Sequence, residues 1–308
     1  MDRGVYATVL HSHTTFRPFS FSCNRGTHDI ELIIDSGGSV MLTTRTTPIA
    51  LLDEASLSTT PPERLAELAM SPIDEVRQLV ALNPSSPDVA HLQLCEDPSP
   101  DVRAALVKNP EIAEHLFDRL SCDIDTTVRC AVARSSKCPV DLMLEFLTSN
   151  NIRILTNLAL NVMLPADIIS ALAEHPNAQV RMYVAMHPAC GEELLTQLAC
   201  DVSPQVRAMV ATHPLCPRSA QRELALDPVD EVVTALASNS ACSEQAQLAI
   251  ADSDNLPACV TLAANPACSP EALNLLLLHD NPNISGQLLK RTDVSYKLLW
   301  RVAGRHTN

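Results

Sequence analysis

Glycine and aromatic residues are both scarce in this sequence, and the two shortages narrow the choice of fold. The chain has 7 glycines in 308 residues and 3% aromatics, whereas 46% of its residues are apolar. The core must therefore be built from Leu, Val, Ala and Ile, a mixture that favours helices. The 22 prolines must lie at helix ends, because a proline inside a helix costs about 3 kcal/mol.

Positive charge and long apolar runs are also in short supply. The chain has 22 Lys and Arg against 36 Asp and Glu, a net charge of −14, which disfavours nucleic acid as a partner. Neither a run long enough to span a membrane nor a secretory leader is present, so we expect no membrane partner. The 11 cysteines are odd in number and mostly far apart, which disfavours a disulfide framework. We expect a cytoplasmic protein.

What the sequence does contain is a repeat of 26 residues without insertions. We call each set of residues at this spacing a column and each of the nine repeats a row. One column holds Asn83, Asn109, Asn161, Asn239 and Asn265, with Ser135, His187, His213 and Arg291 in the gaps. Three other columns are apolar in every row, and chance produces one such column about once in a thousand. They are Leu68, Leu94, Leu120, Phe146, Leu172, Leu198, Leu224, Ile250, Leu276; Val76, Val102, Val128, Ile154, Val180, Val206, Val232, Ala258, Ile284; and Val80, Leu106, Val132, Leu158, Val184, Val210, Leu236, Leu262, Leu288.

Each row is predicted to hold two helices. Side chains that accept hydrogen bonds from free N–H groups precede the second helix: Ser99, Asp125, Asn151, Asn177, Ser203, Asn255 and Asn281. We expect that helix to end at the asparagine and histidine column, whose residues tolerate a left-handed backbone. Helices of about eight to ten residues are marginal alone, so the rows must stack around one continuous core.

The repeat divides the chain into two parts. Residues 58–308 are predicted to form an all-α solenoid of about nine two-helix repeats, with residues 292–308 as a C-terminal half-repeat cap. Residues 1–57 do not fit the repeat. Residues 29–46 alternate apolar and polar side chains around Ser36-Gly37-Gly38, which favours a short β-hairpin. A disordered N-terminal segment, or a mis-assigned start with Met41 as the first residue, is the alternative.

Three segments carry a family resemblance: "DPSPDVRAALVKNP", "DVSPQVRAMVATHPLCP" and "HPNAQVRMYVAMHPAC". They resemble leucine-rich repeat variant (LRV) proteins, an ARM/HEAT-like helical repeat superfamily found in bacteria. The resemblance implies a right-handed α-α superhelix in which one helix of each repeat is α or 3₁₀. One type of family member has an N-terminal four-cysteine iron–sulfur cluster. Here Cys23 is the only cysteine before Cys95, so the cluster is not carried over.

An arginine column invites a phosphate-binding interpretation: Arg77, Arg103, Arg129, Arg181 and Arg207. At 100° per residue, this column lies within the inward arc of the second helix. We therefore interpret it as a structural ladder between repeats, with packed stems and guanidinium groups paired to carboxylates. Asp97, Asp123 and Asp201, each six residues before an arginine, are the candidate partners.

A cysteine column invites a metal site: Cys138, Cys190, Cys216, Cys242 and Cys268. Neighbouring rows are about 8–10 Å apart, whereas thiolates sharing one zinc lie about 2.3 Å from it. We therefore expect small apolar residues at tight turns and no cofactor, with redox sensitivity as the alternative. No nucleophile and base stand at a catalytic spacing, so we expect no enzyme.

The outward columns of the second helix are irregular, and they supply the candidate site. In rows four to six they place Leu160, Met182, Tyr183, Met186 and Met209 together, with Asn157 beside them. Adaptable methionines with one aromatic residue are typical of a protein-binding groove. The leading hypothesis is a scaffold that binds a protein or peptide.

Two alternatives stay open. A HEAT-like nucleic-acid-binding protein requires a continuous basic groove, and the outward columns supply Lys108, Arg134 and Lys290. A redox or iron–sulfur-associated protein is the other. A further interpretation of the outward apolar residues in rows four to six is that they are ordinary protein surface without a binding function.

Overall fold

A computed structural model describes residues 22–24, 28–34, 40–46 and 48–292. Nineteen helices lie within these residues. None of them has the length and apolar character needed to cross a membrane. The chain divides into two compact units, Met1–Val132 and Ala133–Asn308.

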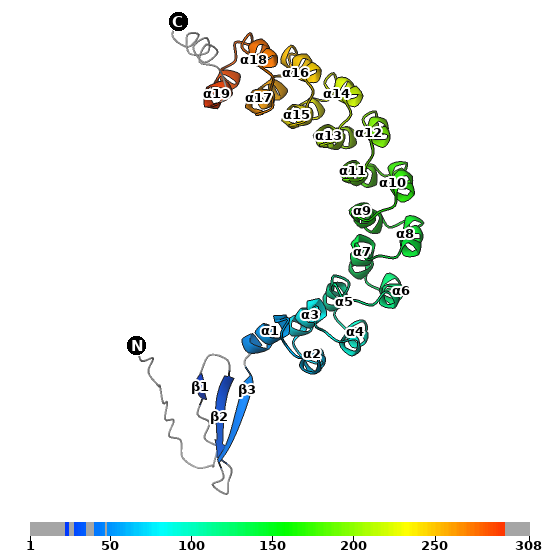
Figure 1. Ribbon diagram of the computed structural model, residues 1–308, viewed down its shortest axis with the longest axis vertical. Coiled ribbons are helices and arrows are strands. Elements are labelled where there is room, and N and C mark those ends of the chain that lie inside the picture. Colours follow the sequence, from blue (N-terminus) through cyan, green and yellow to red (C-terminus); the bar gives the residue numbers. More distant parts are fainter. Residues whose placement is uncertain (1–21, 25–27, 35–39, 47, 293–308) are drawn as a thin grey trace, which may run out of the picture. The chain divides into compact units, whose positions relative to one another are not determined.

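The first unit holds six complete helices in two layers. Its helices are α1 (Pro48–Ser56), α2 (Pro62–Leu68), α3 (Asp74–Leu82), α4 (Asp88–Leu94), α5 (Pro100–Leu106) and α6 (His115–Ser121). Helices α1, α3 and α5 pack side by side in one layer, and the even-numbered helices form the other (Figure 1). Helix α7 (Thr126–Arg134) contains the division between the units.

The second unit continues the same alternation. Its helices are α8 (Val140–Leu147), α9 (Ile152–Ala159), α10 (Ala166–Ala173), α11 (Ala178–Ala185), α12 (Glu192–Leu198), α13 (Pro204–Thr212), α14 (Arg218–Leu224), α15 (Asp230–Ser238), α16 (Glu244–Ala251), α17 (Leu256–Ala264), α18 (Pro270–Leu276) and α19 (Pro282–Lys290). Each odd-numbered helix from α9 to α17 packs on the next odd-numbered helix. The predicted all-helical solenoid is confirmed, and both helices of each repeat are α. The expected cap beyond residue 292 lies outside the described residues.

The three apolar columns form the core. No member of any of the three is more than 7% exposed. They come from both helices of each row, so each helix buries one stripe against its partner and against neighbouring rows. Burying a Leu, Val or Ile side chain is worth about 1.5–3 kcal/mol, which stabilises helices too short to fold alone.

A small antiparallel sheet precedes the helices. It contains β1 (Ser22–Asn24), β2 (His28–Ile34) and β3 (Val40–Thr46) in the order β1-β2-β3. Ile34 pairs with Val40, and His28 pairs with Thr46. The turn expected at Ser36-Gly37-Gly38 lies outside the described residues.

The helical array begins half a repeat before residue 58. Helix α1 starts 26 residues before α3 and occupies the place of a second helix. The side-chain amide of Asn83 donates to the carbonyl oxygens of Ala55 and Leu57, at 2.8 and 2.9 Å. The repeat pattern did not predict this helix, because Glu54 stands in the otherwise apolar column of Val80, and Leu57 stands in the asparagine column.

Second helices end at the asparagine column as predicted, at Asn83, Asn239 and Asn265 for example, but the asparagines have a further role that was not predicted. Asn83 and Asn265 follow their helices with extended backbones, at φ −73° and −70°, so the expected left-handed conformation was wrong. The side chain binds the preceding row instead. Asn109, for example, donates to the carbonyl oxygens of Ala81 and Asn83 and accepts from the amide of Glu111. The column therefore satisfies buried backbone groups between rows.

The predicted caps of the second helices are confirmed for five residues. The side chains of Asp125, Asn151, Asn177, Asn255 and Asn281 each accept from an N–H group in the first turn of the helix that follows. Ser99 and Ser203 accept no such bond, so that part of the prediction was wrong. In both cases proline follows directly at the first helical position, where no N–H group needs a partner.

Candidate functional site

The arginine column forms bidentate ion pairs between rows. In each of Arg77, Arg103, Arg181 and Arg207, Nε lies 2.6 Å from Oδ2 of an aspartate 20 residues later. A second bond joins Nη2 to Oδ1 at 2.8–3.0 Å. The partners are Asp97, Asp123, Asp201 and Asp227. Charge-assisted pairs of this geometry are among the strong hydrogen bonds of proteins.

The pairing differs from the one that the sequence suggested. The aspartate six residues before an arginine was expected to bind it with its carboxylate, but it supplies its backbone carbonyl instead: Arg103 Nη1 lies 2.5 Å from the oxygen of Asp97. The carboxylate comes from the next row. Because 6 and 20 add to the period of 26, one aspartate column satisfies both spacings. Asp227 was not among the partners predicted from the sequence. It has no arginine six residues later but has Arg207 twenty residues earlier, and this was the signal in the sequence for the longer spacing.

Three of these carboxylates, those of Asp123, Asp201 and Asp227, have lowered pKa values. Burial alone raises the pKa of Asp123, but hydrogen bonds from the Arg103 guanidinium and the Asp125 amide outweigh it and lower the pKa below its usual value. The pKa values of Asp201 and Asp227 are lowered by the same balance. Four of the five arginines are thus engaged in ion pairs inside the repeat array.

Arg129 differs from the other four. The residue 20 positions later is Ser149, and Arg129 binds the carbonyl oxygens of Asp123 and Ile124 and the hydroxyl of Thr126. It is half-buried. These hydrogen bonds all go to neutral groups near it in the sequence.

The cysteine column is buried throughout. Burial raises the pKa of Cys138 and Cys242 to about 12, and that of Cys190 and Cys216 to about 11. Such thiols are protonated at neutral pH and are poor nucleophiles and metal ligands. Over the described ranges, no group of three or more His, Cys, Asp or Glu could hold a metal ion.

The candidate binding residues lie in or directly after α9, α11 and α13, which pack in sequence along one layer. Met186 is 48% exposed. Asn157, Leu160, Met182, Tyr183 and Met209 are half-buried, so they are less exposed than the helical-wheel argument suggested. The Asn157 amide donates to the carbonyl oxygen of Arg153 at 2.8 Å.

Two exposed residues next to this group escaped the periodicity argument. Val162 and Met163, in the turn after α9, are each 61% exposed. They lie outside any helix, so a 3.6-residue period does not describe them. The signal for them is Val162 itself, which stands where five other rows have proline. We call Leu160, Val162, Met163, Met182, Tyr183, Met186 and Met209 together the α9–α13 face.

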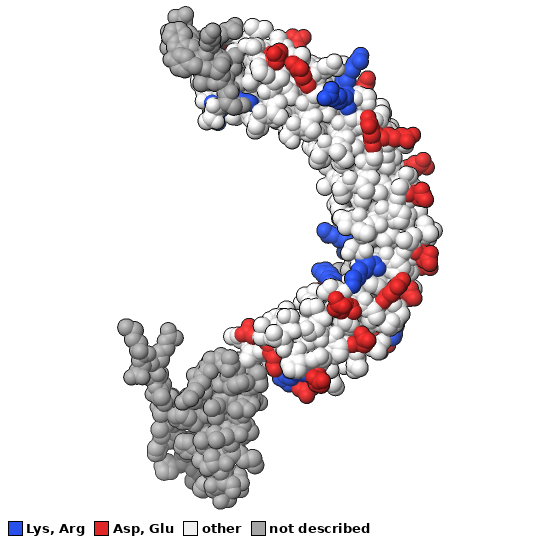
Figure 2. Space-filling view, in the orientation of Figure 1, with Lys and Arg blue, Asp and Glu red and all other residues white. Residues whose placement is uncertain are grey.

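Helices α9, α11 and α13 contain no Asp or Glu. Of their arginines, Arg181 and Arg207 are held in ion pairs, and Arg153 is exposed. The neighbouring even-numbered helices carry Asp141 and Glu145 in α8, and Glu192 and Glu193 in α12. Figure 2 shows the resulting contrast, with red carboxylates along the outer edge, where α8, α10 and α12 lie, and a largely white surface over α9, α11 and α13. In a chain of net charge −14, this face lacks negative charge.

Comparisons with known proteins give no further guide to this site. No protein-family model matches the sequence, and no curated protein matches it significantly.

Proposed function

We propose that this chain is a non-enzymatic scaffold that binds a protein or peptide through the α9–α13 face. The observation that carries the proposal is a group of adaptable apolar side chains in an otherwise acidic protein. They lie on or directly after α9, α11 and α13, three neighbouring odd-numbered helices without carboxylates. Methionine and tyrosine provide large contact areas that adapt to a partner. Exposed apolar groups of this kind are typical of interaction sites.

The ion pairs favour a protein over a nucleic acid as the partner. Arg77, Arg103, Arg181 and Arg207 each bind a carboxylate, so their charge is already neutralised and contributes little to binding phosphates. The raised pKa values of the buried cysteines also argue against a redox function.

We further propose that the chain is related to the LRV proteins that its repeats resemble. The 26-residue pairs of α-helices support this relationship. So does the recurrence of the arginine and asparagine contacts in phase with the repeat.

The proposal is tested by affinity capture from a native extract of the source cells. We compare the wild-type protein with the Tyr183→Ala plus Met186→Ala variant. The matched control is Val202→Ala plus Leu226→Ala, which removes exposed side chains of the same unit outside the face. We expect a specific partner to be lost from the face variant and retained by the control. Equal capture by all three proteins contradicts the proposal.

A further inference from the structure

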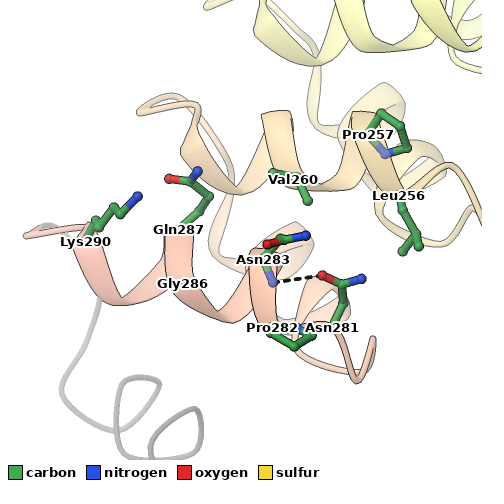
Figure 3. Close-up of a pocket in the computed structure, with 9 residues that line it drawn as sticks. All are labelled: Leu256, Pro257, Val260, Asn281, Pro282, Asn283, Gly286, Gln287 and Lys290. Carbon is green, nitrogen blue, oxygen red and sulfur yellow. Dashed lines mark hydrogen bonds between the residues drawn. The ribbon is translucent and has the colours of Figure 1, made fainter.

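A second feature of the odd-numbered layer lies between α17 and α19. A cavity of about 480 Å³ opens there. Its α17 side is apolar and is formed by Leu256, Pro257 and Val260, whereas α19 contributes Asn283, Gln287 and Lys290. Figure 3 shows these three polar side chains spaced along the α19 ribbon, with Val260 of α17 opposite them.

Gly286 lines this cavity. Glycine inside a helix is less favourable than alanine by about 1 kcal/mol, so its presence calls for a reason. A close approach of another group is not that reason, because a Cβ added at Gly286 meets no atom within 4 Å. A positive φ is not the reason either, since the backbone there is an ordinary helix. The remaining effect of the glycine is to leave space beside the polar side chains of α19.

The polar side chains match the spacing of an extended peptide. Asn283 and Gln287 are four residues apart, about 6 Å along a helix, which is close to the repeat of two residues in an extended chain, about 6.6 Å. A carboxamide both donates and accepts a hydrogen bond. The two side chains can therefore pair with successive main-chain groups on one edge of a peptide, while an apolar side chain of that peptide enters the space at Gly286.

Lys290 lies about 4.5 Å further along the helix, close to the place of the next peptide residue. No carboxylate of the described residues forms an ion pair with it. An ammonium group at this point fits a negative charge at the end of the peptide. A terminal carboxylate supplies that charge together with acceptor oxygens for the hydrogen bonds.

We propose that the cavity between α17 and α19 binds the C-terminal carboxylate and last residues of a peptide partner. The inference rests on the proposed function, because Gln287 occupies the column of Tyr183 and Met209, and Lys290 that of Leu160 and Met186. The cavity therefore belongs to the same set of repeat positions as the α9–α13 face. The inference adds to the proposed function that the C-terminal end of the partner is the part bound at α19.

The test uses two pools of synthetic random heptapeptides, one ending in a free carboxylate and the other in a carboxamide. Each pool is passed over the immobilised full-length protein, and retained peptides are quantified by mass spectrometry. We expect the free-acid pool to be enriched about tenfold over the amide pool, as for loss of one charge-assisted contact.

Two variants test whether the preference for the free acid arises at this cavity. Gly286→Leu fills the cavity, and Lys290→Gln removes the charge, so both should abolish the preference for the free acid. Gly286→Leu should fold well, because leucine is a better helix former than glycine, and its thermal unfolding midpoint serves as the check. The matched control is Thr234→Leu, at the same repeat position in α15 and outside the cavity. It should keep the preference.

Equal retention of the two pools overturns the inference, and so does a preference that survives in Gly286→Leu. The peptide experiment and the capture experiment can fail independently, so a failure of the cavity inference is distinguishable from a failure of the proposed function. If the Tyr183→Ala plus Met186→Ala variant loses its cellular partner while the wild type shows no free-acid preference, the cavity inference fails and the α9–α13 face stands. A free-acid preference with unchanged partner capture by that variant supports the cavity and contradicts the face.

Discussion

Arg103 in α5 joins two aspartates of neighbouring rows. Its Nε and Nη2 donate to the carboxylate of Asp123, 20 residues later, while Nη1 donates to the backbone carbonyl of Asp97. The carboxylate of Asp97 is itself paired with Arg77. The pairs are therefore linked from row to row, and each arginine holds the loop before its own helix as well as the loop of the next repeat.

This linkage predicts that Arg103→Ala destabilises the protein strongly. The substitution leaves the Asp123 carboxylate, which is 8% exposed, without its ion partner. Breaking a buried pair in this way costs about 3 kcal/mol or more. The free energy of unfolding from urea denaturation measures the loss.

Arg129→Ala is the matched control. Since Arg129 binds neutral groups, we expect a cost of about 1 kcal/mol, closer to that of ordinary hydrogen bonds. The sequence grouped Arg129 with the arginines paired to carboxylates, whereas the structure gives it neutral hydrogen-bond partners. Equal losses in the two variants contradict the distinction between them.

The paired aspartates predict a loss of stability in acid. The folded-state pKa values of Asp123, Asp201 and Asp227 are lowered, so the ionised form favours the fold. The stability they add is complete above the unfolded pKa of about 4 and is lost as the pH falls below it towards the folded values.

Urea denaturation between pH 5 and pH 3 measures this loss. The Arg103→Ala plus Asp123→Ala variant lacks one pair, so its unfolding free energy should change less with pH than that of the wild type. An identical pH dependence in the two proteins would show that the Asp123 pair does not contribute.

A buried histidine predicts a second pH effect nearer neutrality. His91 in α4 is 1% exposed, and its Nδ1 atom has no hydrogen-bond partner. Burial lowers its pKa, so it stays neutral in the folded state while the unfolded chain takes up a proton below about pH 6.5. Stability should therefore begin to fall as the pH drops below that value.

His91→Leu should fold, because leucine occupies the same column in Leu65 and Leu195. It should reduce this effect, of which the buried His213, whose pKa is also lowered by burial, retains a part. We expect the variant to be more stable by about 1 kcal/mol at neutral pH, since a buried group without a partner is removed. Its advantage should grow at pH 5.5. The exposed His115 provides the control substitution, His115→Leu, for which no such growth is expected.

The cysteines should differ sharply in reactivity. Cys122 and Cys200 are exposed, whereas the cysteine column is buried and its Cys138 and Cys242 thiols have pKa values of about 12. Brief treatment of the native protein with iodoacetamide at pH 7.5, followed by peptide mass spectrometry, should show alkylation at Cys122 and Cys200. Rapid alkylation of the column would instead support the redox alternative.

The periodicity of the sequence predicted the core because each buried position recurs in all nine rows. It did not predict which of two aspartates binds each arginine, since spacings of −6 and +20 are equivalent under a period of 26. Nor did it find α1, where Glu54 and Leu57 break two columns at once. Helical phase placed Met186 outward, but it gave no information on Val162 and Met163, which lie in a turn.

The central claim is that the α9–α13 face contacts a protein partner. Site-specific photo-crosslinking tests it most directly, with a photoreactive phenylalanine analogue placed at position 183 or, as a control, at position 226 of the full-length protein in its native cells. We predict that residue 183 crosslinks a discrete protein species that residue 226 does not. The absence of any crosslinked species at 183, or the same species at both positions, would contradict the account.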